Sequence, residues 1–235
     1  MSQTIPTASP LAFTSAPDSR QFLQQELERL QGQLLRLTPA NPILERAALH
    51  FRIGEVMLEI AHDGMPEAAW GLTKEAFMIY RDHQQWEDAV RCCDLLFRTG
   101  LPYAVPALGN GLWLAITYPI NPEITVLMLN NLIEATPDTA DGAAVAAAVA
   151  HYIVDMRLEG EKRESTLFLT SALLGKVAER HSQVDSQEKM DRWLEKLGLL
   201  DPAIFLPRMG MVIDALVDGQ WWYDRDVLRS QLPVN

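Results

Sequence analysis

The sequence predicts an all-α protein built from antiparallel helical hairpins, stacked as a solenoid or an irregular helical array. Apolar residues recur at the helical spacing i, i+3, i+4 and i+7 along most of the chain, and no segment alternates as a strand does. Gly, Pro, Asn and Asp separate these segments at short intervals, which places consecutive helices side by side. Of the 235 residues, 48% are hydrophobic and 22% charged, a balance typical of a folded domain.

The amino-terminal part divides into a tail and two helices. Residues 1–17 are rich in Ser, Thr and Pro and have no periodicity, which predicts a flexible tail before a single domain over 18–235. Asp18 and Gln21 form a possible capping box that opens a helix over 18–37. The helix over 44–61 has apolar residues on two sides, which is typical of a helix packed between two neighbours.

The remaining helices follow from periodicity and from recurring start signals. An N-cap side chain precedes Pro at Asn41-Pro42, Asn121-Pro122 and Asp201-Pro202, where the missing N–H of proline costs nothing. Gly109-Asn110-Gly111 lacks the strand and the Lys of a phosphate-binding loop, so we interpret it as a helix end or kink. The apolar pattern predicts helices over 66–80, 86–97, 103–117, 122–135, 141–158, 162–181, 186–197 and 208–217.

Charge and cysteine content argue against several classes of protein. The 31 acidic and 20 basic side chains give a formal charge of −11, which disfavours nucleic acid and anionic membranes as partners. No apolar stretch is long and uninterrupted enough to predict a membrane span. The adjacent Cys92 and Cys93 cannot easily bond each other within one helix, and no signal peptide is recognisable, so we expect a reducing, cytoplasmic location.

One segment resembles the tetratricopeptide-repeat family. Ala76-Phe-Met-Ile-Tyr80 is followed by Ala89, and the family places an aromatic on its first helix and a small residue nine positions later. Leu101-Pro102 lies near the place where the family ends a repeat with Pro. The sequence departs from the pattern at Thr73, Phe77, Cys93 and Leu96, so only one repeat is recognisable. The resemblance implies stacked helical pairs whose inner surface binds a protein or peptide.

Two pairs of residues are candidates for a metal site and for an acid–base pair. Glu59 and His62, three apart on a helix, could bind one metal, but a carboxylate-bridged site needs a second Glu-x-x-His motif that the chain lacks. His151 and Asp155, four apart, could act as an acid–base pair, yet no nucleophile lies in a recognisable turn nearby. A solvated helix face and a helix-packing pair explain these residues more simply, and we expect no catalytic residues and no cofactor. Cys92 and Cys93 are expected to be structural thiols.

The carboxyl-terminal segment concentrates aromatic side chains at Trp221, Trp222 and Tyr223. Such residues either dock a partner or close the end of the helical stack, and we favour the second alternative. Tyr80 and Trp86 are further candidate binding residues. The sequence thus favours a protein-binding adaptor, scaffold or assembly chaperone that acts through a helical groove. The alternative is a helical enzyme, or enzyme subunit, with a carboxylate–histidine site.

Overall fold

The computed structural model, which describes residues 17–60 and 65–232, confirms the predicted fold class. Every regular element in these residues is an α-helix. Their bounds in chain order are α1 Pro17–Arg36, α2 Ile43–Ile60, α3 Met65–Asp82, α4 Trp86–Arg98, α5 Val105–Thr117, α6 Pro122–Ala135, α7 Asp141–Arg157, α8 Gly160–Ser182, α9 Gln187–Lys196, α10 Pro202–Val217 and α11 Arg225–Ser230. The predicted tail lies almost wholly outside the described residues.

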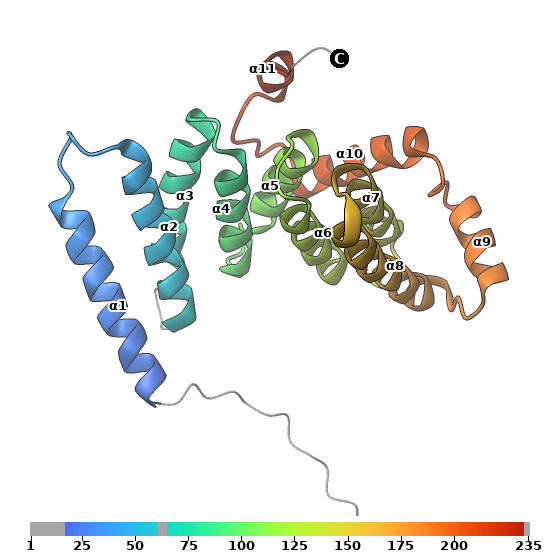
Figure 1. Ribbon diagram of the computed structural model, residues 1–235, viewed down its shortest axis with the longest axis horizontal. Helices are drawn as coiled ribbons and strands as arrows, with labels where there is room; N and C mark the ends of the chain where they lie inside the picture. The colour runs from blue at the N-terminus through green and yellow to red at the C-terminus, as the bar shows by residue number, and fades with distance from the viewer. Residues whose placement is uncertain (1–16, 61–64, 233–235) are drawn as a thin grey trace, which may run out of the picture.

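The first eight helices form a solenoid-like array in which each helix packs against the next (Figure 1). The even-numbered helices form one layer, because α4 contacts both α2 and α6. The chain then leaves this pattern. Helix α9 packs against α8, and α10 turns back to pack on α5 and α7 of the odd-numbered layer. One layer of the array is therefore partly covered by the chain's own carboxyl-terminal part.

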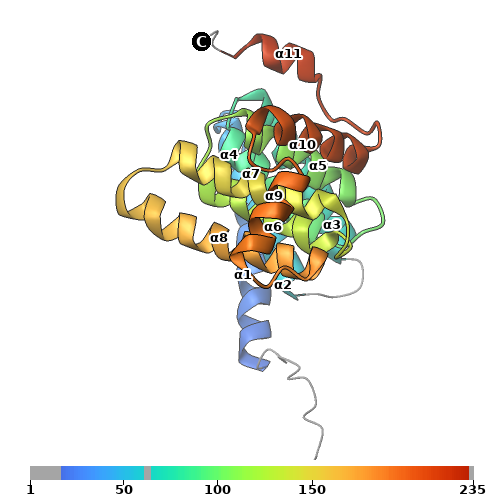
Figure 2. The same cartoon turned by 90° about the vertical axis from the view of Figure 1, so that its right-hand side faces the viewer.

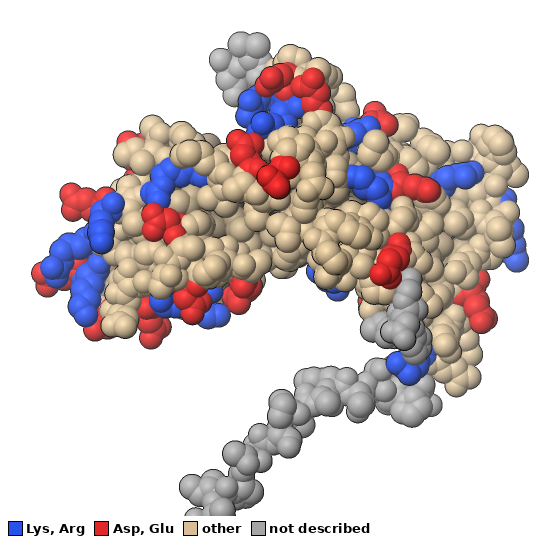
Figure 3. All heavy atoms as spheres, turned by 180° about the vertical axis from the view of Figure 1, so that it is seen from behind, with Lys and Arg blue, Asp and Glu red and all other residues tan. Residues whose placement is uncertain are grey.

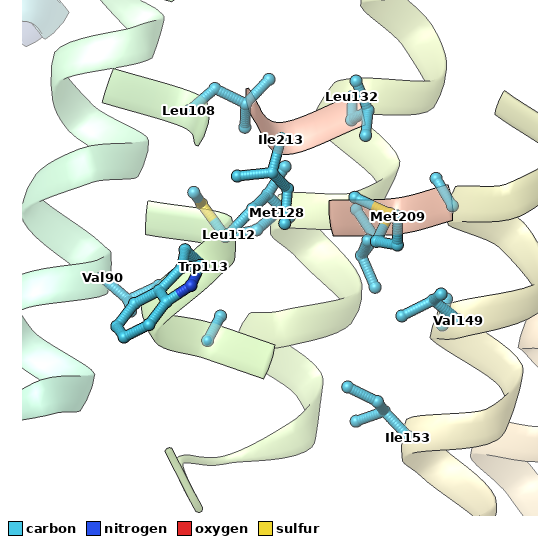
Figure 4. Close-up of a cluster of buried hydrophobic side chains, with 14 of the residues drawn as sticks. Val90, Leu108, Leu112, Trp113, Met128, Leu132, Val149, Ile153, Met209 and Ile213 are labelled. Carbon is cyan, nitrogen blue, oxygen red and sulfur yellow. The ribbon is translucent and has the colours of Figure 1, made fainter. Parts of the chain in front are cut away.

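Many buried side chains of the core lie where α5, α6, α7 and α10 meet (Figure 4), and the sequences of these helices explain why they pack closely. All eight residues from Ala143 to Ala150 are buried, because small side chains let α7 approach its neighbours closely. Met209 and Ile213 bring α10 onto the side chains of α5, α6 and α7. Helix α2 contributes to two clusters of buried side chains and lies between α1 and α3, as its two apolar sides predicted.

The helix starts confirm two of the three predicted caps. The side chains of Asn121 and Asp201 accept hydrogen bonds from the backbone N–H groups of Glu123 and Ala203, at 3.0 and 2.8 Å. Helix α10 therefore begins at Pro202, six residues before the predicted bound, although it contains a second proline, Pro207. Asn41 instead accepts hydrogen bonds from Thr38. Helix α11 was not predicted, because six residues show too little periodicity.

The interpretation of Gly109-Asn110-Gly111 as a helix end is wrong. Helix α5 runs through all three residues as one element. A Cβ atom added at Gly109 would lie 2.6 Å from a methyl group of Val217, and one at Gly111 would lie 2.5 Å from Cβ of Cys93. The two glycines allow α10 and α4 to approach α5, so they serve close helix packing rather than chain breaking.

The surface agrees with the charge pattern of the sequence. Acidic and basic side chains are interspersed over the face seen in Figure 3, without an extended basic area. Within residues 17–60 and 65–232, no helix combines the length and the apolar character needed to cross a bilayer.

Cys92 and Cys93 are both buried and free, and burial raises the pKa of each thiol, as expected of structural cysteines.

Candidate functional site: a groove that holds the carboxyl-terminal arm

The chain reverses direction directly after α10. Asp218 and Gly219 adopt left-handed backbone angles, with φ of 47° and 74°. The next residues return across α3 and α5 before α11, which stands away from the array (Figure 1). We call residues 218–232 the carboxyl-terminal arm. We call the surface beneath its start the arm groove, formed by Trp70, Lys74, Phe77 and Arg81 of α3 and by Asn110 and Trp113 of α5.

Asn110 holds the backbone of the arm from the middle of α5. Its side-chain oxygen accepts a hydrogen bond from the N–H of Trp222 at 3.1 Å, and its amide nitrogen donates to the carbonyl of Gln220 at 3.3 Å and to that of Pro106 at 2.8 Å. The residue is fully buried. Its amide thus satisfies one donor and one acceptor of the arm, in the way that a neighbouring backbone would.

Two further hydrogen bonds hold the same stretch of the arm. The guanidinium of Arg81 donates to the carbonyl of Trp222 at 2.7 Å, and the Tyr223 hydroxyl donates to the carbonyl of Asn110 at 2.6 Å. The Asn110 carbonyl lies inside α5, so the side chain of Tyr223 extends between helices to reach it. Burial raises the pKa of Tyr223, and its proton remains available for this bond. The bonds from Asn110 and Arg81 to the arm backbone do not depend on the side chains of the arm, whereas the bond of Tyr223 does.

The Trp222 ring occupies the α3 side of the groove. Its centroid lies 5.1 Å from that of Phe77, at an interplanar angle of 73°, and 6.2 Å from that of Trp70, at 90°. Both contacts are edge-to-face, the geometry that aromatic quadrupoles favour. Trp221 and Tyr223 lie on the α5 side, where their centroids are 6.4 and 5.4 Å from that of Trp113.

A lysine is trapped under the arm. The Nζ atom of Lys74 lies 2.7 Å from the centroid of the Trp222 ring, is buried, and has no hydrogen-bond partner among the described residues. Its pKa is lowered to about 7, chiefly because burial disfavours the charged form; Cys93 acts in the opposite direction and Arg81 contributes to the lowering. The face of the Trp222 ring stabilises the ammonium form. In the occupied groove, the arm therefore contacts the ammonium group of Lys74 through the π system of Trp222 and not through a hydrogen bond.

The outer part of the arm is held more loosely. Arg225 stacks over Trp221, with its guanidinium carbon 4.0 Å from the ring centroid, and pairs with Asp214 of α10 at 2.7 Å. The Tyr118 hydroxyl donates to the carbonyl of Leu228 in α11 at 3.4 Å. No residue of α11 is buried, so the arm is anchored chiefly at residues 220–223.

The structure brings three of the predicted binding residues together and separates the other two. Trp221, Trp222 and Tyr223 are half-buried and lie across α3 and α5 in the middle of the array, so they do not close its end. Trp86 stacks on Tyr118 with centroids 3.9 Å apart and lines a hollow of about 400 Å³ beside the arm. Tyr80 is buried in the core, where desolvation raises its pKa to about 12.

Sequence reasoning missed the residues that receive the arm. Lys74 and Trp70 lie within the segment that resembles a helical repeat, but nothing in their spacing marks a groove. Asn110 gave one usable signal, which is a polar residue between two glycines in an otherwise apolar helix. Such a residue must find buried hydrogen-bond partners, and the interpretation as a helix break concealed that requirement.

The metal and acid–base candidates are not assembled into sites in the part of the chain that the structure describes. Glu59 is exposed on α2, and His62 lies outside the described residues. Residues 17–60 and 65–232 contain no cluster of three His, Cys, Asp or Glu side chains suited to a metal. His151 Nδ1 lies 3.0 Å from the Thr170 hydroxyl, and Asp155 pairs with Arg163. His151 and Asp155 line a hollow of about 360 Å³ without a bond to each other.

Comparison of the chain with protein-family models, with curated proteins and with solved structures finds no match. The functional argument accordingly rests on the geometry of the arm groove.

Proposed function

We propose that the protein is a protein-binding adaptor, scaffold or assembly chaperone, and that the arm groove is its binding surface for an extended segment of another protein. The observation that carries the proposal is the way Asn110 and Arg81 hold the backbone of Gln220 and Trp222. Bonds to backbone atoms provide affinity without selecting side chains, and neighbouring pockets provide the selection. The tetratricopeptide-like character of α3 and α4 remains a prediction in keeping with this role.

The chemistry of the groove indicates what it accepts. Trp70, Phe77 and Trp113 offer ring edges and faces to large apolar or aromatic side chains, which dominate binding energies at interfaces. The present occupant supplies Trp221, Trp222 and Tyr223 to these positions. The arm is attached through a short turn, and none of its residues in α11 is buried, so a partner segment competes with an intramolecular ligand. Only molecules whose groove is open can bind the partner. The apparent affinity for the partner is therefore the intrinsic affinity multiplied by the fraction of such molecules.

The test uses a fluorescent peptide with the sequence of residues 218–232, titrated with the full-length chain. The wild-type chain should bind it weakly, since its own arm occupies the groove. Trp222→Ala weakens the intramolecular arm and should tighten peptide binding several-fold, whereas adding Asn110→Ala to it should abolish the gain. Asn131→Ala is the matched control, because the side chain of Asn131 bonds Asp94 on the even-numbered layer, away from the arm. Failure of every folded variant to bind the peptide would contradict the proposal.

The same variants identify the natural partner. Proteins captured from the native cell by Trp222→Ala, in which the groove is open, should be depleted in the Asn110→Ala double variant. Capture that is equal in both variants would place the binding surface elsewhere. Metal content of the wild-type chain purified without chelator addresses the enzyme alternative, since stoichiometric metal lost in a Glu59→Gln, His62→Gln variant would favour it.

A further inference from the structure

Lys74 differs from the other polar groups of the arm groove, because the arm gives it no hydrogen-bond acceptor. Asn110 and Arg81 both bond backbone atoms of the arm. The Nζ atom of Lys74 is buried under the Trp222 ring and has no hydrogen-bond partner among the described residues. The groups that act on its charge are Cys93 and Arg81, and neither is a carboxylate. The groove therefore contains a buried cation that a different occupant can pair better.

A carboxylate suits this position better than a ring face does. The contact of an ammonium with an aromatic ring is weaker than a close ion pair in a desolvated site. A carboxylate loses water on entering the groove, which normally offsets much of the gain. The ammonium of Lys74 is already buried in the occupied groove, so its share of that cost is common to both occupants.

The arm shows where such a carboxylate would enter. Trp221 and Tyr223 lie against Trp113 on the α5 side, whereas Trp222 between them lies over Lys74 on the α3 side. The hydrogen bonds at residue 222 are made by its backbone N–H and carbonyl groups. They do not depend on its side chain, so an acidic residue at this place keeps them.

We propose that the partner segment bound by the arm groove carries an acidic residue between two large aromatic residues, and that its carboxylate pairs with Lys74 in the place of the Trp222 ring. This inference rests on the proposed function, because it names the kind of segment that the groove accepts. The aromatic neighbours of the acid retain the packing on Trp113. Helix α11 stands clear of the other helices in Figure 2, so displacement of the arm separates no helices of the array.

The preference for an acid is a local property of the groove. The chain has a formal charge of −11, so its overall field repels an acidic segment at long range. A preference for an acidic over a neutral residue of the same shape therefore has to come from groups in the groove. Of the two cations that α3 places there, Arg81 pairs with Asp82 at 2.6 Å. Lys74 is the one without a carboxylate partner among the described residues.

Two matched peptides isolate the effect of the charge. Both have the sequence of residues 218–232, one with Trp222→Glu and the other with Trp222→Gln, which has nearly the same shape without the charge. Fluorescence anisotropy measures their binding to the full-length Trp222→Ala chain and to the wild-type chain. The arm of each chain competes equally with both peptides, so it does not change the ratio of their Kd values. We expect the Glu peptide to bind at least roughly tenfold more tightly, the lower end of couplings between close charges across an interface.

Variants of the chain attribute this ratio to Lys74. Lys74→Met keeps an unbranched apolar side chain and should remove the difference between the two peptides, as a double-mutant cycle requires of a direct pair. Lys176→Met is the matched control, since it removes the same charge on α8, where Lys176 has a 3.7 Å contact with Glu134. That variant should retain the full ratio. Circular dichroism checks that each variant keeps its helical content.

The unaltered arm peptide separates this inference from the proposed function. If it binds the Trp222→Ala chain and the Glu and Gln peptides bind equally, or their ratio survives Lys74→Met, only the acidic partner is overturned. The same holds if the arm peptide binds and neither test peptide does, because the groove then requires a ring over Lys74. If the arm peptide binds no folded variant, the proposed function fails and this inference fails with it.

Discussion

The arm groove and the outer face of α8, which is opposite α7, both carry aromatic side chains, yet the two surfaces are built differently. The groove combines large aromatic rings with buried polar anchors at Asn110, Arg81 and Lys74, and part of the chain occupies it. The α8 face exposes Phe168 and Leu169 among charged residues such as Glu164 and Lys176. Buried polar atoms demand a particular partner backbone, whereas an exposed aromatic among solvated charges makes no such demand. The difference teaches that exposure alone does not indicate what a surface binds.

We expect the largest difference in stability between loss of Trp222, whose ring is packed in the groove, and loss of Phe168, whose ring is exposed. Trp222→Ala should lower the free energy of unfolding by about 3 kcal/mol, because it removes the ring that packs on Phe77 and Trp70. Phe168→Ala should change the stability of the monomer by less than about 0.5 kcal/mol, since its side chain is mostly in water. Urea unfolding at low protein concentration measures both variants. Similar midpoints for the two variants would remove the basis for calling one surface occupied and the other free.

A polar anchor should matter almost as much. Asn110→Ala removes the bonds to Gln220 and Trp222 and leaves those backbone groups without a partner, at a cost of about 2 kcal/mol. Asn131→Ala loses a single half-buried bond to Asp94 and should cost about 1 kcal/mol or less. Chemical denaturation of the two variants compares them directly. Equal costs would show that the arm contributes no more than an ordinary surface bond.

Alanine substitutions at two glycines should change the stability of the protein in opposite directions. Gly111→Ala should destabilise the protein by roughly 1–3 kcal/mol, because the new methyl group would overlap Cys93 and a terminal methyl of Met128. Gly175→Ala should stabilise the monomer by up to about 1 kcal/mol, since the added methyl has open space and alanine favours the helix. Thermal unfolding of dilute samples shows both shifts. A loss of stability for Gly175→Ala would mean that the α8 face is not free.

A pH-dependent effect concerns Lys74. Its pKa falls from 10.5 in the unfolded chain to about 7 in the folded protein, so the unfolded chain binds more protons between these values. The contribution of Lys74 to stability therefore rises with pH above about 7 and is lowest below it. The difference in unfolding free energy between wild type and Lys74→Met should shrink as pH rises from 7 to 9. A difference that is constant over that range would exclude titration of Lys74 under the arm.

The sequence by itself determined the helices, because the spacing of apolar residues is a local property that each segment carries. Ten of the eleven described helices match predicted segments, and the N-cap residues Asn121 and Asp201 lie at helix starts. The buried thiols of α4 were also predicted, because free cysteine behaves as a small apolar residue. The aromatic cluster at Trp221, Trp222 and Tyr223 was recognised as important through composition alone, although not where it would lie.

Only the tertiary structure decided which surfaces meet. Asn110 and Trp222 are 112 residues apart, and no pattern in either segment specifies that one accepts a hydrogen bond from the other. The apparent break at Gly109 and Gly111 became a place of close packing only when α4 and α10 lay against it. Periodicity tells each helix which face to bury, but the neighbour that buries it depends on how the whole chain packs.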